Sequence, residues 1–290
     1  MGAQPNDYVS ELPNELTEML KGVVLPEMSG TREQCIYKVP QKIRQINPQA
    51  YTPRLISIGP FHSPLGSNSD QNHLQEMEGL KLKYLKGFLN RTTHINVDNL
   101  FFEVQEWENK IRNCYAGLIS FDSKDFLKII IVDACFIIEH FLRFYDKNTI
   151  MSKDDPILMK HYLHGDIVRD LILLENQIPF FVLEKIYKLA NINRVLELPP
   201  FITIAIHYFE DFIKQNSNSV HFTNPKLLEH FTDVKPPEHF TDLLRTFLLP
   251  LSLRFPHPEK ENTDHAKEQV YSVSQLSEAG LKVKANAYLT

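Results

Sequence analysis

The sequence predicts a mainly α-helical globular domain, with a few short extended segments or a small sheet near residues 35–61. Three observations predict this fold class. Apolar residues make up 43% and charged residues 23% of the 290 residues, which is ordinary usage for a chain with a hydrophobic core. Apolar side chains recur at helical spacing over most of residues 73–250. Pro40, Pro53 and Pro60 lack backbone donors, so any sheet near residues 35–61 is expected to be small or at an edge.

The first 34 residues are expected to form a short helix (residues 8–22) and a linker, and residues 35–290 to form the main domain. Two segments of that domain, "CIYKVP" (35–40) and "YTPRLISIGPF" (51–61), are rich in β-branched and aromatic residues and predict extended backbone.

Helical spacing begins at residue 73. In "HLQEMEGLKLKYLKGFL" (73–89) the apolar stripe includes Met77 and Tyr84, and we place Glu78 and Lys81 on the solvent side. A second stripe runs from Leu100 to Leu118. It predicts one amphipathic helix with Asp98 as its N-cap, supported by Glu106–Lys110 and Glu108–Arg112 pairs on its outer face.

The longest apolar segment, "FLKIIIVDACFIIEHFL" (126–142), approaches the length of a membrane span. It contains Lys128, Asp133, Glu139 and His140, and a charge at a bilayer centre costs about 2.5 to 3.5 kcal/mol. We therefore predict a buried central helix near residues 125–145 and no membrane span in this chain.

The segment "DLILLENQIPFFVLE" (170–184) predicts a corner between two helices. Pro179 cannot continue an incoming helix, but it fits the first turn of a new one. Further helices are expected over residues 201–213, after Pro199 and Pro200, and over residues 236–250.

Charge and motifs exclude several functions. A formal net charge of -5 gives no basic field, so we expect no nucleic-acid partner. The three cysteines have no CxxC spacing and are expected to be reduced, partly buried thiols. Gly-rich phosphate loops, GxSxG and HExxH are all missing, and we assign no catalytic residue and no cofactor.

Five acids lie within apolar helical segments, namely Asp133, Glu139, Asp170, Glu175 and Glu184. Buried carboxylates can serve as a general acid and base, because burial raises their pKa toward neutral pH. The alternative is that each acid caps a helix end, points out of a partly exposed face, or pairs with an Arg or Lys, as Glu139 would with Arg143 four residues later.

Asn176 and Gln177 also have two interpretations. They can satisfy both helix ends at the corner, accepting from the helix that Pro179 opens and donating to the last carbonyls of the incoming one. Alternatively, their amides line a ligand pocket. His62, after "SIGPF", is expected in a loop or at a pocket rim.

The weak metal candidate is "HYLHGD", in which His161 and His164 lie three residues apart with Asp166 close behind. Two histidines and a carboxylate bind zinc or iron when they face one point. With no further ligand identifiable, we predict a surface helix start instead of a metal site.

The ordered segments "IYKVP", "AYTPRLISIGPFH", "MEGLKLKYLKGFL", "FLKIIIVDACFIIEHFLR", "DLILLENQIPFFVLEKIY" and "HFTDLLR" together resemble one family. It is the plant family called domain of unknown function 247, also called uncharacterised protein family 0481. The resemblance covers residues 36 to about 245, and "LLENQIPFFVLE" and "DACFIIE" are its most specific parts.

The resemblance implies a limited set of properties. Family members are typically longer and end in a hydrophobic anchoring helix, so residues 35–290 are expected to be the N-terminal two thirds of the family domain, without its C-terminal part and anchor. This truncated member is expected to be soluble and cytoplasmic as given, whereas its full-length relatives are expected to be membrane-associated. No catalytic residue is established for the family. Some grass members are associated with self-incompatibility, which favours recognition or signalling through a protein partner.

Two alternatives to the recognition function stay open. One is a ligand-binding or hydrolase-like protein, which would need a pocket over roughly 300 Å³ lined by at least two of the buried acids. The other is a nonfunctional truncated product. The sequence does not give the oligomeric state.

Overall fold

The computed structural model describes residues 34–66, 72–92, 95–146, 155, 157, 160–190, 198–216 and 236–248. Internal contacts divide the chain into two units, Met1–Leu249 and Pro250–Thr290, and all described residues belong to the first. The helix expected over residues 8–22 lies outside the described residues.

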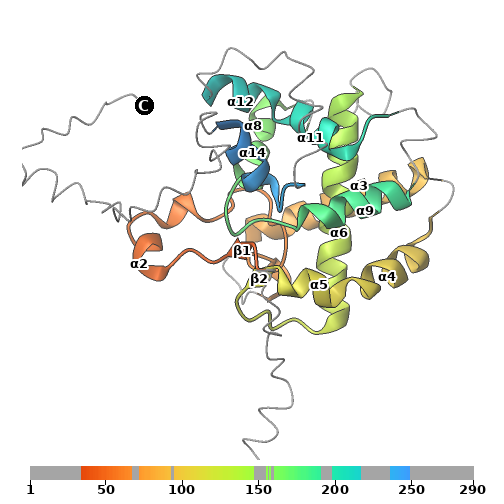
Figure 1. Ribbon diagram of the computed structural model, residues 1–290, viewed down its shortest axis with the longest axis horizontal. Helices are drawn as coiled ribbons and strands as arrows, with labels where there is room; N and C mark the ends of the chain where they lie inside the picture. Colours follow the sequence, from red (N-terminus) through yellow and green to blue (C-terminus); the bar gives the residue numbers. More distant parts are fainter. Residues whose placement is uncertain are drawn as a thin grey trace, which may run out of the picture. The chain divides into compact units, whose positions relative to one another are not determined.

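Helix α6 (Ser123–Tyr145) is the centre of the described fold (Figure 1). Asp122 caps its first turn by accepting a hydrogen bond from the Asp125 N–H at 2.7 Å. Among the described residues, four helices pack against α6: α3 (Asn72–Arg91), α4 (Val97–Glu106), α9 (Phe180–Leu189) and α11 (Phe201–Tyr208). This packing explains why α6 is buried on nearly every side between Phe126 and Leu142. The predicted buried central helix is confirmed, and none of the helices in the described ranges is long and apolar enough to cross a membrane.

Two helices precede α6 along the chain, and the second differs from the prediction. Helix α3 (Asn72–Arg91) is confirmed. The single helix expected from Asp98 to Leu118 is wrong, because the chain forms α4 (Val97–Glu106) and α5 (Glu108–Asn113), interrupted at Trp107. The Trp107 N–H bonds to the carbonyl three residues back, which tightens the last turn of α4.

The ends of this helical pair also correct the prediction. The N-cap of α4 is Asn96 in place of Asp98, with its side chain accepting from the Asn99 N–H at 2.8 Å. After Asn113 the chain turns into a strand, so Leu118 leaves the apolar stripe and is 90% exposed. The Glu108–Arg112 pair is present at 2.8 Å.

The sheet in the described ranges has two short parallel strands, β1 (Ile36–Tyr37) and β2 (Tyr115–Ala116). Ile36 pairs with Tyr115 and Tyr37 with Ala116. The extended segment predicted at 51–61 forms no strand, and short helical turns flank it: α2 (Gln41–Arg44), η2 (Pro48–Ala50) and η3 (Pro64–Gly66).

The remaining described helices follow the corner. Helix α8 (His161–Leu171) ends before residues 172–179, which we call the corner, and α9 (Phe180–Leu189) begins directly after Pro179. The helix expected over residues 201–213 is two, α11 (Phe201–Tyr208) and α12 (Glu210–Asn216), and α14 (Phe240–Leu248) is the last.

Candidate functional site

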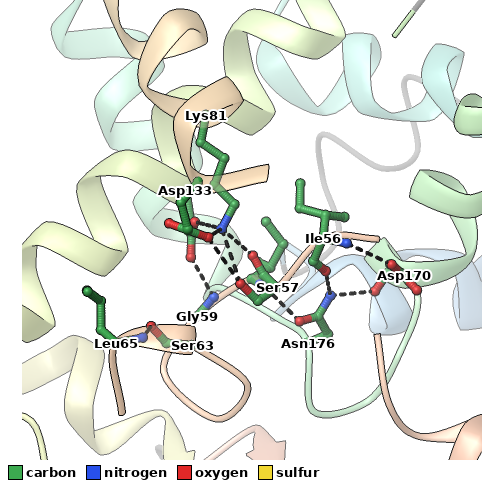
Figure 2. Close-up of polar contacts among 11 residues, drawn as sticks. Ile56, Ser57, Gly59, Ser63, Leu65, Lys81, Asp133, Asp170 and Asn176 are labelled. Carbon is green, nitrogen blue, oxygen red and sulfur yellow. Dashed lines mark hydrogen bonds and ion pairs between the residues drawn. The ribbon is translucent and has the colours of Figure 1, made fainter. Parts of the chain in front are cut away.

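The polar residues selected from the sequence converge on one non-helical segment, residues 53–60, which we call the buried loop. All of its residues except Arg54 and Leu55 are buried. A loop inside a core has backbone N–H and C=O groups that are not hydrogen-bonded within a helix or a sheet. Each such group costs free energy if it is buried without a partner. Side chains from α3, α6, α8 and the corner satisfy them (Figure 2).

Asp170, in the last turn of α8, accepts hydrogen bonds from three consecutive N–H groups of the buried loop. Its carboxylate lies 3.0 Å from the Arg54 nitrogen, 2.7 Å from that of Leu55 and 3.0 Å from that of Ile56. Arg169 supplies a positive charge at 2.9 Å. Three fixed backbone donors and a guanidinium occupy this fully buried carboxylate, so it acts here as an anchor for the loop.

Asn176 connects the loop to the end of α8. Its Oδ1 accepts from the Ile58 N–H at 2.6 Å, and its Nδ2 donates to the carbonyls of Ile56 and Asp170, both at 2.9 Å. Figure 2 shows this amide lying between the loop and α8. Donation to the incoming helix agrees with the prediction, whereas the accepted N–H belongs to the buried loop and not to α9.

Gln177 joins the corner to a different helix from the one expected. Its Nε2 donates to the carbonyls of Leu171 and Leu173 at 2.6 and 2.8 Å. Its Oε1 accepts from the N–H of Phe240, the first residue of α14, at 3.1 Å. The expected acceptance from α9 is wrong because the Phe180 N–H bonds to the Glu238 carbonyl at 2.8 Å.

Glu175 binds groups from two other segments. It accepts from the Val39 N–H at 2.5 Å, forms an ion pair with Arg44, and lies 3.1 Å from His62 Nε2. Burial pushes the pKa of Glu175 upward, but the bonds from His62, Val39 and Arg44 outweigh it and lower the pKa to about 2. His62, predicted in a loop or at a pocket rim, is in a loop with its side chain only 9% exposed.

Asp133 of α6 forms a buried ion pair with Lys81 of α3, with the two charged atoms 2.6 Å apart. Asp133 also accepts from the Gly59 N–H at 2.8 Å, and Lys81 donates to the Ser57 carbonyl at 2.6 Å. Burial raises the pKa of Asp133 to about 6, although Lys81 opposes that rise. Figure 2 shows both side chains directed at the buried loop.

Placing Lys81 on the solvent face was wrong, because Lys81 is 1% exposed. A signal for its position was present in the sequence. Lys81 lies four residues after Met77 and three before Tyr84, which puts it on the apolar stripe of α3. Its partner Glu78, 2.6 Å away, retains 31% exposure.

Glu139 belongs to a second polar cluster, on the other half of α6. Arg143 contacts it at 2.8 Å, as expected from the spacing of four, and Arg91 of α3 contacts it at 2.9 Å. Arg143 reaches on to Asp155 at 2.9 Å, and Asp155 accepts from the Tyr84 hydroxyl at 2.7 Å. Two guanidiniums around one fully buried carboxylate make this a charge-compensated crosslink between α3 and α6.

The residues of "HYLHGD" form the start of α8. The His164 ring stacks on Phe144 with 4.9 Å between the centroids. Asp166 is half-buried, and the side chain of His161 lies outside the described residues. Among the described residues no group of three histidines, cysteines or acids is placed to hold a metal ion.

A hollow of about 160 Å³ opens beside the sheet. Its lining residues are the residue after β1, the end of the buried loop with the residues that follow it, and the segment after β2: Lys38, Pro60, Phe61, Ser63, Leu118, Ile119, Ser120 and Phe121. The Lys38 ammonium lies 4.7 Å from the Phe61 ring centroid. None of the four buried acids lines this hollow, so it lacks the feature that would favour hydrolytic chemistry.

Comparison with known proteins decides the family. A family model described as a plant protein of unknown function matches residues 36–289, which is most of the chain. The chain belongs to this family, DUF247. The resemblance in the six sequence segments is thereby confirmed, and within "LLENQIPFFVLE" the Asn176 side chain bonds to the buried loop of this DUF247 chain.

Two relatives of this DUF247 chain come from Arabidopsis thaliana. The protein named UPF0481 protein At3g47200 is 33% identical over 198 residues, which is 68% of this chain and 39% of the relative. The putative UPF0481 protein At3g02645 is 35% identical over 150 residues, 52% of this chain and 26% of the relative. The chain thus spans well under half the length of these relatives. No solved structure matches.

Proposed function

We propose that this DUF247 chain acts in protein–protein recognition or signalling and does not itself catalyse a reaction. One observation carries the proposal. The acids and amides that could perform chemistry are bonded to the chain's own backbone and to its own cations. Asp170 holds three backbone N–H groups, and Asp133 is paired with Lys81.

A reactive acid has to meet a substrate and change its protonation state. Asp170 and Glu139 are 0% exposed and Glu175 is 4% exposed, so a substrate has no direct access to these carboxylates. If such a carboxylate left the buried loop to act on a substrate, the loop N–H groups would lose their hydrogen-bond acceptor. A buried N–H group without an acceptor costs free energy, which opposes any catalytic cycle that uses these acids. This arrangement supports a scaffold whose function resides on its surface.

The described surface presents large apolar side chains that are available to a partner. Leu118 is 90% exposed, Ile46 84% and Phe102 66%. The fully buried core of a protein–protein interface is rich in apolar side chains, and a few of its residues carry most of the binding energy. The family's association with self-incompatibility in some grass members supports the same class of function.

The test is affinity purification from plant tissue with the wild-type chain and three single variants, Leu118→Asp, Ile46→Asp and Phe102→Asp. The recognition function predicts a protein that is enriched with the wild type, is lost with one variant and is retained with the other two. The three variants serve as controls for one another, because each introduces the same charge at an exposed position. Direct binding is then measured with the two purified proteins.

Two results would overturn the proposal. One is that no protein is enriched above a control bait while a small molecule raises the melting temperature of the purified chain, which would favour the ligand-binding alternative. The other is that every enriched protein also binds all three variants and a heat-denatured bait, which indicates nonspecific adhesion and would agree with a nonfunctional product.

A further inference from the structure

Two of the three cysteines face one another across the small sheet. The register pairs Ile36 with Tyr115, so the residues directly before them, Cys35 and Cys114, are also opposite. The backbone confirms this, because the N–H groups of Cys35 and Ile36 both donate to the Cys114 carbonyl at 2.9 Å. Their proximity is therefore fixed by the pairing of the strands.

The two thiols are in direct contact. The Cys35 side chain is hydrogen-bonded to that of Cys114, and Cys114 Sγ donates onward to the Lys110 carbonyl at 3.3 Å. Neighbouring strands lie about 4.8 Å apart, and disulfides join Cα atoms separated by about 4.4 to 6.8 Å. The backbone spacing thus suits a disulfide, and Cys35 is partly exposed to an oxidant whereas Cys114 is buried.

We propose that Cys35 and Cys114 are a redox pair that forms a reversible disulfide by exchange with a low-molecular-weight disulfide such as glutathione disulfide. The partly exposed Cys35 reacts first. Its thiolate attacks one sulfur of glutathione disulfide, the bond between the two glutathione sulfurs breaks, and one glutathione leaves as a thiolate. Cys35 is then a mixed disulfide.

Cys114 completes the exchange. Its thiolate attacks Cys35 Sγ, the mixed disulfide breaks, and the second glutathione leaves. In total, two protein thiols lose two electrons and two protons, and one glutathione disulfide becomes two glutathione thiols. Reduction by excess thiol reverses each step.

The surroundings of Cys35 make this exchange slow at neutral pH. The hydrogen bond with Cys114 raises the pKa of the Cys35 thiol, as do burial and the negative charges of Glu238 and Asp242 near the start of α14. His239, from the same segment, donates to the Cys35 carbonyl at 3.0 Å, and its Nδ1 accepts the Asp242 N–H. Because only the thiolate reacts, the rate is expected to rise steadily with pH.

The disulfide would join the segment that leads into the domain to the end of α5, closing a loop of about 80 residues. Closing a loop of this length restricts the unfolded chain. The melting temperature of the oxidised chain is therefore expected to lie about 5 to 10 °C above that of the reduced chain.

The experiment treats the purified full chain with excess glutathione disulfide at about pH 7 and about pH 8.5, stops the exchange with acid, and analyses the unreduced digest by mass spectrometry. We expect a peptide pair crosslinked between Cys35 and Cys114, formed faster at the higher pH, together with the rise in melting temperature. Dithiothreitol should reverse both. The Cys135→Ser variant should behave like the wild type, because Cys135 is fully buried in α6.

Three results would overturn the proposal: a glutathione adduct that stays on Cys35, a crosslink that includes Cys135, or two unmodified thiols after prolonged exposure at the higher pH. The Cys35→Ser and Cys114→Ser variants should each lose the crosslink and the thermal shift. If either variant fails to fold, the wild-type digest still decides, because it identifies the bonded cysteines directly.

Discussion

Replacing Gly59 by alanine tests how closely the buried loop packs against the corner. Gly59 has φ +73°, in the left-handed region. A Cβ at this position would lie 2.5 Å from the Gln177 carbonyl oxygen and 3.0 Å from the Tyr115 hydroxyl. The Tyr115 hydroxyl donates to that same carbonyl at 3.0 Å, so the added methyl group would press on a hydrogen bond between β2 and the corner.

The expected cost follows from three contributions. The left-handed conformation costs alanine about 1 to 2 kcal/mol. Moving the Gln177 carbonyl weakens its bond with Tyr115, which contributes about 0.5 to 1.5 kcal/mol. Displacing the loop lengthens the charged bond from the Gly59 N–H to Asp133, for which about 1.5 to 3 kcal/mol is at risk. We expect Gly59→Ala to lower the free energy of unfolding by about 3 to 6.5 kcal/mol. This is a large part of the stability typical of a domain, which is about 5 to 15 kcal/mol.

Gly79→Ala is the matched control. Gly79 lies on an exposed position of α3, and an added Cβ would meet no atom within 4 Å. The same substitution there should stabilise the chain by about 0.5 to 1 kcal/mol, because alanine favours the helix. The assay measures the urea unfolding of both variants, with circular dichroism as the probe of the folded state. If Gly59→Ala unfolds within about 1 kcal/mol of the wild type, the loop is not held against the corner as described.

Two further predictions concern the acids. Asp170→Asn should lower the free energy of unfolding by about 2 to 4 kcal/mol, because an amide nitrogen replaces an acceptor oxygen, whereas Asp166→Asn on the same helix should change it by less than about 0.5 kcal/mol. If thermal melts show the same loss of stability for the two variants, Asp170 does not anchor the buried loop. The low pKa of Glu175, about 2 against an ordinary 4.5, means that its contribution to stability is present above about pH 4.5 and is lost as the pH falls toward 2. Stability of the Glu175→Gln variant should therefore fall less steeply across that range, and parallel acid-unfolding curves for the two proteins would show the pKa assignment to be wrong.

The buried loop explains why the segment "DLILLENQIPFFVLE" combines apolar and polar residues. The corner lies between the end of α8 and the start of α9, and its Gln177 bonds to the first residue of α14. Its Asn176 also bonds to the buried loop, which lies more than 110 residues earlier in the chain. A hydrophobic side chain at this position would leave the Ile58 N–H and the Ile56 carbonyl unbonded in the core. The polar triplet Glu175, Asn176 and Gln177 is required by the backbone groups that surround it.

The sequence alone determined the family, the helical class and the position of most helices. Helices depend on local spacing and on caps, and the apolar stripe of α3 and the continuous apolar run of α6 are both visible in neighbouring residues. The bond between Glu139 and Arg143 was also predictable, because a separation of four residues brings two helical side chains together.

Only the tertiary structure decided which distant groups those side chains bind. The pairing of Asp133 with Lys81, the three N–H groups on Asp170, and the contact of Cys35 with Cys114 all join residues that are 50 or more positions apart. Nothing local specifies such pairs, since they arise when packed helices enclose a loop whose backbone groups must find partners inside the core. The sequence placed Asp133 and Asp170 within apolar segments but put Lys81 on the solvent side, and the fold determined the atoms to which each side chain is bonded.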